Sequence, residues 1–478
     1  MGHGHHIEIK QETFVVPAKG KQFAMILMIL GLILAGIGIA NIDKHAGAHD
    51  EHSKVEAKSQ GSHEAATAHT HNEHAEHAVA AESHEADAHA EHGNVPNEKF
   101  GPRVEYHPIE HPWQTKIWAN LLIAGYFFLM VSLCAMFWIA IQYAANAGWS
   151  AAVKRIPEAM FTFVPVAFGV LLISVIIAKN DLYHWAHYEH LHLKVGDAGY
   201  DKILDGKSGF LNSTLFFVLP IVLVTIWYIL GRRLRSLSLQ EDSAAKGDTT
   251  FFKKSILTSA ILAVIFGFTI SFMAWFFIMS IDAHWYSTIF GVYNFITHWV
   301  TAITIIALLT AYLKKLGYLN IVSDEHIHDL GKFMFAFTIF WAYIWLSQYL
   351  LIWYAQIPEE MYYYQIRFEE YKANFLGNLV MNFCLPFALL LMRSAKRNRW
   401  VLGIIGTIMI LGHYHDVWFM VMPGVFGPGM QIGVLEVGVF MFFAGLFLIW
   451  TLTALTKRGL IPVNHPYIEE SAHHDVGV

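Results

Sequence analysis

Ten long apolar runs dominate this sequence and limit what the chain can fold into. A helix needs about 20 mostly apolar residues to cross a lipid bilayer, and runs of roughly this length recur along the chain. The pattern predicts an all-α membrane protein with about ten transmembrane helices. The runs lie at residues 23–40, 117–145, 157–178, 210–231, 252–281, 288–313, 332–354, 374–392, 400–422 and 432–455.

Composition supports this class and excludes several others. Of the 478 residues, 55% are hydrophobic and 15% are charged, whereas a soluble domain is about 25% charged. A net charge of −6 offers no basic face to phosphates, so we expect no nucleic-acid partner. The two cysteines, Cys134 and Cys384, form neither a CxxCH haem-attachment motif nor an iron–sulfur ligand set. Only His298 and His413 lie well inside the apolar runs, too few for the spaced histidine pairs of a transmembrane haem or for a haem-copper centre. We therefore expect no catalytic residue, metal or redox cofactor in this chain.

The basic residues between the runs predict how the chain is oriented. Short cytoplasmic loops of membrane proteins are enriched in Lys and Arg. With the N-terminus in the cytoplasm, the cytoplasmic segments carry 20 of the 32 basic residues, and two opposite loops, 282–287 and 422–431, carry none. We therefore expect a multi-pass protein of the bacterial inner membrane, with both termini cytoplasmic and the loop after the first run periplasmic.

The first run has a second interpretation as a cleaved signal peptide. It has a basic flank, an apolar stretch and, at residues 38–40, a sequence that resembles a signal-peptidase site. Cleavage would leave nine helices and a periplasmic N-terminus. We prefer an uncleaved helix, because Gly31, Ala35, Gly36 and Ala40 suit close helix packing.

The long loop of residues 41–116 is rich in histidine. Eleven histidines and no aromatic residue lie between Asn41 and Lys99, and such a stretch buries too little apolar surface to fold alone. One hypothesis is a metal-loading or pH-sensing segment, in which His71, His74 and His77 would share one face of a helix. We favour a solvated low-complexity segment, because composition alone defines no closed ligand set.

Ionisable residues inside the apolar runs are candidate functional residues, because a charge in the bilayer is costly. His413, His415 and Asp416 lie in the outer half of the ninth run, Glu436 in the outer half of the tenth, and His298 in the sixth. Carboxylates and imidazoles at one depth suit proton movement or hydrogen bonding to a quinone. We identify His413, Asp416, Glu436 and His298 as candidates for a proton path; the alternative is a network that only joins helices.

Other polar residues have a functional and a structural interpretation. Glu158 lies in the first turn of the third run, where an acid commonly caps a helix, and proton entry is the second interpretation. Asp282 and His284 follow the fifth run, and Gln348 and Trp353 lie in the aromatic-rich seventh. These four are candidates for contacting a quinone or a partner subunit; alternatively, they join helices or belong to the interfacial aromatic belt.

Several ordered motifs resemble a known family of membrane subunits. The chain is similar to the ActF subunits of alternative complex III, a quinol:cytochrome c or electron-carrier oxidoreductase. These subunits belong to the NrfD-like family of polysulfide-reductase membrane subunits. The resemblance covers nearly all of residues 117–455. Its motifs are HIHDLGKF at 326–333, WAYIWLSQY at 341–349, IWYAQIPEE at 352–360, MSIDAHWYST at 279–288, and LGHYHD at 411–416 with MPG at 422–424.

The resemblance implies a fold, a role and partners. The role is a scaffold and candidate proton pathway beside a quinol-oxidising sister subunit. The partners are that NrfD-like subunit, an iron–sulfur subunit, cytochrome c subunits and lipids, with a haem-copper oxidase as a further candidate. Menaquinone, haem c and iron–sulfur clusters would belong to the complex. The resemblance implies four-helix bundles at 117–281 and 282–422, with the first and tenth helices flanking them. The chain then divides into 1–40 with the first helix, the loop 41–116, which carries no resemblance, the two bundles, and the last helix with its tail at 423–478.

One departure from the family bears on the proton path. Related subunits often carry an acid after the tryptophan of the fifth helix, but here Trp275 is followed by Phe276 and Phe277. The departure argues against a quinol site or a continuous proton path in the first bundle. Two alternatives to a respiratory subunit remain open: a secondary transporter, whose paired interrupted helices are not evident here, and a purely structural membrane anchor.

Overall fold

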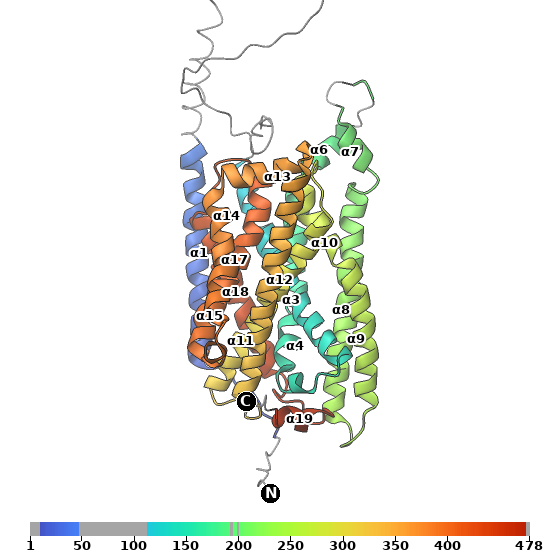
Figure 1. Cartoon of the computed structure of the whole chain (residues 1–478), viewed down its shortest axis with the longest axis vertical. Coiled ribbons are helices and arrows are strands. Elements are labelled where there is room, and N and C mark those ends of the chain that lie inside the picture. The colour runs from blue at the N-terminus through green and yellow to red at the C-terminus, as the bar shows by residue number, and fades with distance from the viewer. Residues whose placement is uncertain (1–9, 47–111, 192–194, 198–199, 475–478) are drawn as a thin grey trace, which may run out of the picture.

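The computed structural model describes residues 10–46, 112–191, 195–197 and 200–474. In this part of the chain, ten helical spans are long and apolar enough to cross a membrane, and they run side by side (Figure 1). The prediction of an all-α, multi-span membrane protein is confirmed. The candidate histidines His71, His74 and His77 lie outside the described residues.

Seven spans are single helices and three are interrupted. The single ones are α1 (Ala18–Ala46), α3 (Trp113–Ala144), α8 (Ser213–Ser243), α11 (Ile289–Lys315), α12 (Asp324–Ala355), α17 (Arg399–Phe426) and α18 (Val434–Thr456). The interrupted ones are α4 (Arg155–Phe161) with α5 (Val164–Leu182), α9 (Thr250–Thr269) with α10 (Ser271–Phe277), and α14 (Lys372–Leu379) with α15 (Leu385–Leu390) around the π-helix η4 (Val380–Cys384). Short helices connect them: η2 (Gly148–Val153), α6 (His184–Leu191), α7 (Lys202–Lys207), η3 (Met279–Ile281), α13 (Pro358–Glu369) and α16 (Arg393–Arg397). One further short helix, α19 (Ile468–Ala472), follows the last span.

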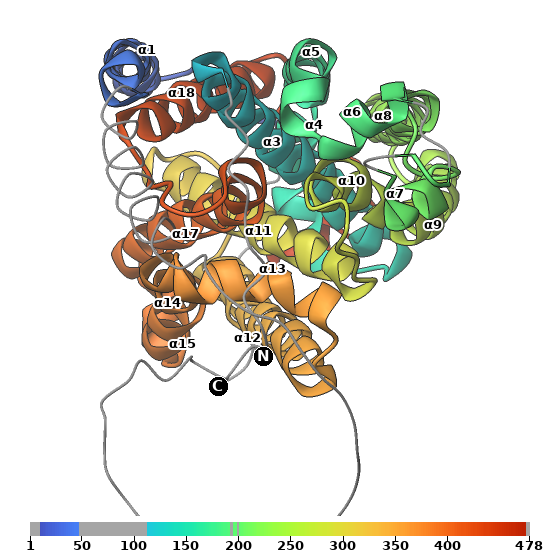
Figure 2. The same cartoon turned by 90° about the horizontal axis from the view of Figure 1, so that it is seen from above.

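Two groups of spans meet at α3 and α11 in the middle of the molecule (Figure 2). On one side α3 packs against α5 and α9, and α8 packs against α9. On the other side α11 packs against α12 and α17, and the α14–η4–α15 span packs against both of these. The helices α3 and α11 contact each other as well as their own groups, and they are the most completely buried of the described spans. They therefore form the core that joins the two groups.

The first and last spans pair along one edge, where glycines bring their backbones together. A Cβ atom added at Gly31 would lie 2.4 Å from the Phe442 amide nitrogen, and one at Gly38 would lie 2.6 Å from the Cα of Leu435. On the α18 side, a Cβ at Gly445 would lie 2.7 Å from an α1 carbonyl. Any larger side chain at these positions would therefore force α1 and α18 apart.

The small-residue face expected on α1 is only partly right. Gly31 and Ala35 contact α18 as expected, but Gly36 has no surrounding atom within 4 Å of an added Cβ, and Ala40 is exposed. Gly38 replaces them. The reason is helical spacing, because residues three and four apart share a face.

Among the spans whose limits differ from those that hydropathy predicts, α8 and the α4–α5 span show why. The fourth apolar run ends at Gly231, but α8 continues to Ser243. The residues beyond Gly231 are mostly good helix formers without an internal glycine or proline. The third run is broken after Phe161, and α5 restarts with Pro165 in its first turn, where proline is well tolerated.

Candidate functional site

Asp416 lies at the centre of a buried polar cluster that joins four spans. We call Tyr293, Thr297, Trp341, Asn378 and Asp416 the Asp416 cluster. Oδ1 of the carboxylate accepts from the Tyr293 hydroxyl and from the Asn378 amide at 2.6 Å. Oδ2 accepts from the Thr297 hydroxyl at 2.9 Å and from the Trp341 indole N–H at 3.2 Å. Within the described residues no cation lies in ion-pair contact with this carboxylate.

The position and partners of Asp416 suit proton transfer. At about 1.5 Å per residue, it lies about 25 Å along α17 from Arg399 and about 15 Å from Phe426. A carboxylate held only by neutral donors can gain or lose a proton without leaving a buried counter-charge unpaired. Such a group is therefore chemically suited to hold or pass on a proton.

Three other predicted residues are buried and carry polar atoms without partners. In the described part of the chain, both ring nitrogens of His413, Nε2 of His298 and both side-chain polar atoms of Gln348 have no hydrogen-bond partner. The ring of His413 meets Trp341 edge-on, with 5.8 Å between centroids, and Trp341 itself donates to Asp416. Buried polar groups are nearly always paired, so these atoms require partners such as water or a ligand.

Glu436 does not join the Asp416 cluster. It lies in the first turn of α18, where its carboxylate accepts from the Gly433 N–H at 2.8 Å. It also accepts from the Asn120 amide at 3.2 Å and lies 3.5 Å from the Lys116 ammonium. The structure thus separates two acids that the sequence places at one depth, and it gives Glu436 a cation and a capping role on the α3 side.

Asp282 forms a buried ion pair with Arg367, a residue that the sequence analysis did not single out. Arg367 of α13 is 2% exposed, and its Nη2 lies 3.1 Å from Asp282 Oδ2. Its guanidinium also donates to the backbone carbonyls of Phe419, at 3.4 Å, and Met420, at 2.9 Å. Pro423 has no N–H to offer the Phe419 carbonyl four residues earlier. Arg367 therefore supplies the donor that this proline removes from α17.

His284 and Trp353 lie nearer the surface. Although His284 is two residues from Asp282, it contacts the other group of spans: its Nε2 lies 2.5 Å from Asp201 Oδ2, and its ring centroid is 5.9 Å from that of His184. Burial raises the pKa of Asp201, but the hydrogen bonds from His284 and the start of α7 outweigh burial and leave this pKa lowered. Trp353 is 45% exposed on α12, which suits an interfacial aromatic.

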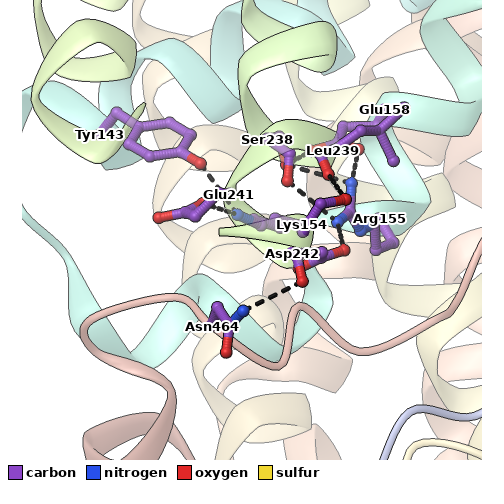
Figure 3. A network of polar contacts seen from close by, with 10 residues as sticks. Tyr143, Lys154, Arg155, Glu158, Ser238, Leu239, Glu241, Asp242 and Asn464 are labelled. Carbon is purple, nitrogen blue, oxygen red and sulfur yellow. Dashed lines mark hydrogen bonds and ion pairs between the residues drawn. The ribbon is translucent and has the colours of Figure 1, made fainter. Parts of the chain in front are cut away.

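Glu158 belongs to a buried ionic network at the end of the molecule where α1 begins and α19 lies. We call Lys154, Arg155, Glu158, Glu241 and Asp242 the terminal network (Figure 3). Arg155 Nη1 lies 2.7 Å from Glu158, and Arg155 Nη2 pairs with Asp242. Lys154 Nζ lies 3.0 Å from Glu241. Each ion therefore has a partner of opposite charge, and the network clamps the η2–α4 junction to the end of α8.

Neutral groups complete the terminal network. The Ser238 hydroxyl donates to Glu158 at 2.6 Å and accepts from Arg155 at 3.1 Å, and Asn464 of the C-terminal tail donates to the Asp242 carbonyl at 3.0 Å. Burial lowers the pKa of Lys154, but Tyr143 and Glu241 outweigh burial and leave this pKa raised. This pairing favours a structural role for Glu158 over proton entry.

The spacing of polar residues in the sequence indicates the partners of Asp416. Asn374, Asn378 and Asn382 recur every four residues within an apolar run, which places three amides on one helix face. In the structure Asn382 donates to Asn378 at 2.5 Å. Tyr293 and Thr297 have the same spacing in α11. Neutral polar residues at helical spacing in an apolar run therefore point to the donors of a buried acid.

The fold and the site define a multi-span membrane protein with a buried carboxylate among neutral donors. Among the described residues, no group of three or more His, Cys, Asp or Glu is arranged to hold a metal ion. Neither a protein-family model nor a curated protein matches the chain.

Proposed function

We propose that this chain is an integral membrane subunit of a respiratory quinol:electron-carrier oxidoreductase of the alternative complex III type. The support is the resemblance of its ordered motifs across residues 117–455, together with a sequence that lacks haem and cluster ligand sets. In this proposal the chain has no redox cofactor of its own. It lies beside a menaquinol-oxidising sister subunit and also contacts iron–sulfur and cytochrome c subunits.

The proposal includes an orientation in the bacterial inner membrane. Both termini lie in the cytoplasm and the His-rich loop lies in the periplasm, because the segments on the side of the termini carry most of the basic residues. The end of the molecule with α19 and the terminal network then faces the cytoplasm. The end with α13 and the Asp282–Arg367 pair faces the periplasm.

Within the complex, the Asp416 cluster holds or passes on a proton. The observation that carries this role is a carboxylate buried in a membrane span, with four neutral donors and no cation in contact. The unpaired ring nitrogens of His413 lie next to Trp341 and extend the set of groups that exchange protons through bound water. Glu436 and Glu158 have cations as partners and hold the helices in place.

The test uses the intact complex, purified through a tag on this chain and assayed for haem, iron, quinol oxidation and proton uptake in proteoliposomes. We expect c-type haem and iron–sulfur signals to copurify. Asp416→Asn should lower coupled quinol oxidation by on the order of 10²-fold, the size of a lost acid–base step. The matched control, Glu436→Gln, removes an acid that lies outside the cluster.

The outcomes separate the competing functions. If the assembled Asp416→Asn complex has unchanged turnover and proton uptake, the proton role is overturned and a purely structural anchor is the remaining role for this chain. A colourless preparation without quinol oxidation would overturn the respiratory proposal, and substrate transport assays would follow. An Asp416→Asn complex with normal haem content and subunit composition, but with impaired proton uptake, would support the proposal.

A further inference from the structure

A groove of about 480 Å³ opens between the end of α11, the start of α12, α16 and the start of α17, at the same end of the molecule as the terminal network. It is separate from the Asp416 cluster, which lies further along α17. Its lining has an apolar part and a polar part. We call the apolar residues Leu308, Ala311 and Gly403 the floor, and we call the polar and aromatic residues the mouth: Tyr312, Lys315, Asp324, Arg397, Asn398, Arg399 and Trp400.

The mouth of the groove has an excess of positive charge. Arg397 pairs with Glu325. Asp324, the one acid among the described residues that line the groove, pairs with Lys314 at 2.7 Å. No acid of the described residues lies in ion-pair contact with Lys315 or Arg399. Two exposed cations therefore remain available for an anion from outside the chain.

The residues around the groove place it at the level of lipid headgroups. Trp400 is 74% exposed at the start of α17, and the Lys315 ammonium lies 4.7 Å from the centre of its ring. Exposed tryptophan at the end of a membrane span marks the boundary between headgroups and acyl chains. One turn further along α17, Ile404 is 63% exposed and lies on the side of the acyl chains. The polar mouth thus borders an apolar, lipid-facing surface.

We propose that this groove binds the headgroup of an anionic phospholipid. The phosphate lies between Lys315 and Arg399, and an acyl chain runs along the apolar floor towards Ile404. Basic pockets between membrane helices on the cytoplasmic side are a recognised setting for anionic headgroups. A free phosphate offers the same charge, but the apolar floor and the exposed apolar residues beside the mouth favour a lipid. The inference does not depend on the respiratory function, but it rests on the orientation proposed above, in which this end of the molecule faces the cytoplasm.

The test measures lipid binding to the intact protein by native mass spectrometry, with phosphatidylglycerol or cardiolipin added and phosphatidylcholine as the neutral probe. The variant Lys315→Gln/Arg399→Gln removes both unpaired cations. The control variant Arg232→Gln/Arg233→Gln removes two exposed charges from α8, in the half of this helix that leads to the terminal network. At about one tenfold step per 1.4 kcal/mol and about 1 kcal/mol per basic residue, we expect affinity for the anionic lipid to fall about thirtyfold in the groove variant.

Each outcome decides the proposal. Support requires that the groove variant loses affinity for the anionic lipid while the control variant changes little. It also requires that phosphatidylcholine binds weakly and that inorganic phosphate, at a 10-fold excess over the protein, does not displace the lipid. Equal loss in both variants would show a non-specific charge effect and overturn the site. Displacement by inorganic phosphate would overturn the lipid in favour of a free anion. Both variants change exposed side chains, and an unchanged melting temperature verifies that they fold.

Discussion

The Asp416 cluster and the terminal network bury charge in opposite ways. The terminal network gathers five ionisable side chains and pairs each with a charge of opposite sign. The Asp416 cluster surrounds one carboxylate with hydroxyl, amide and indole donors. Removing one ion from a paired set leaves another ion uncompensated, whereas neutralising a lone carboxylate leaves only hydrogen bonds to rearrange. The difference fits a structural clamp in the terminal network and the proton site that we propose at Asp416.

The largest expected effect comes from breaking the terminal network. Arg155→Met leaves Glu158 and Asp242 without their guanidinium, and should lower the free energy of unfolding by about 3–5 kcal/mol. Thermal or denaturant unfolding of the purified protein measures the loss. Arg233→Met, on an exposed part of α8, is the control and should stay within about 0.5 kcal/mol.

A further variant isolates charge from packing in this network. Adding Glu158→Gln and Asp242→Asn to Arg155→Met removes the two stranded acids. If unpaired charge causes the loss, the triple variant should recover most of it. If the triple variant is as unstable as the single one, the lost packing of Arg155 is responsible and the comparison with Asp416 fails.

The Arg367 site sharpens the comparison between paired and unpaired buried charge, because Arg367 forms an ion pair with Asp282 and also donates hydrogen bonds to the backbone of α17. Arg367→Gln should lower the free energy of unfolding by about 3 kcal/mol, since Asp282 loses its cation and the Phe419 carbonyl loses its donor. Pro423→Ala restores an N–H for that carbonyl. In the Pro423→Ala background, the loss from Arg367→Gln should shrink by about 1 kcal/mol in a double-mutant cycle. Strictly additive losses would show that Arg367 does not compensate for the proline.

The smallest expected effect is a pH dependence at the edge of the terminal network. His465 packs against Tyr143 and Phe252, and burial followed by the charges of Lys154 and Arg155 lowers its pKa to about 2. Unfolding returns the pKa to about 6.5. The unfolded state therefore binds the proton first, and stability that is complete above pH 6.5 is lost as the pH falls.

That loss should reach on the order of 2 kcal/mol between pH 6.5 and pH 5, at about 1.4 kcal/mol per pH unit. The unfolding midpoint measured across this range gives the slope. His465→Phe should reduce the slope, while His473→Gln, an exposed neighbour, should leave it unchanged. An identical slope in the wild type and His465→Phe would assign the pH dependence to other groups.

Sequence alone predicts the spans well, because length and hydropathy are local properties. It also finds Asp416, since an acid in an apolar run is conspicuous. It does not find what holds that acid: Tyr293 is 123 residues away, and the pairing depends on how α11 and α17 pack. The sequence does not identify Arg155 as part of a buried network, for a related reason. A basic residue beside an apolar run looks like a loop charge until α8 is seen to extend past the run and bring Asp242 to it.

The glycine contact between α1 and α18 also bears on how the chain is made. About 410 residues separate the end of α1 from the end of α18, which corresponds to about 20–80 s of synthesis at about 5–20 residues per second. During that time the first helix is inserted before its main contact exists. Its strongly apolar sequence makes it stable as a single span in lipid before α18 is synthesised. The last of the ten described spans, α18, then docks onto the first, so a truncation that removes α18 would also leave α1 without its main contact.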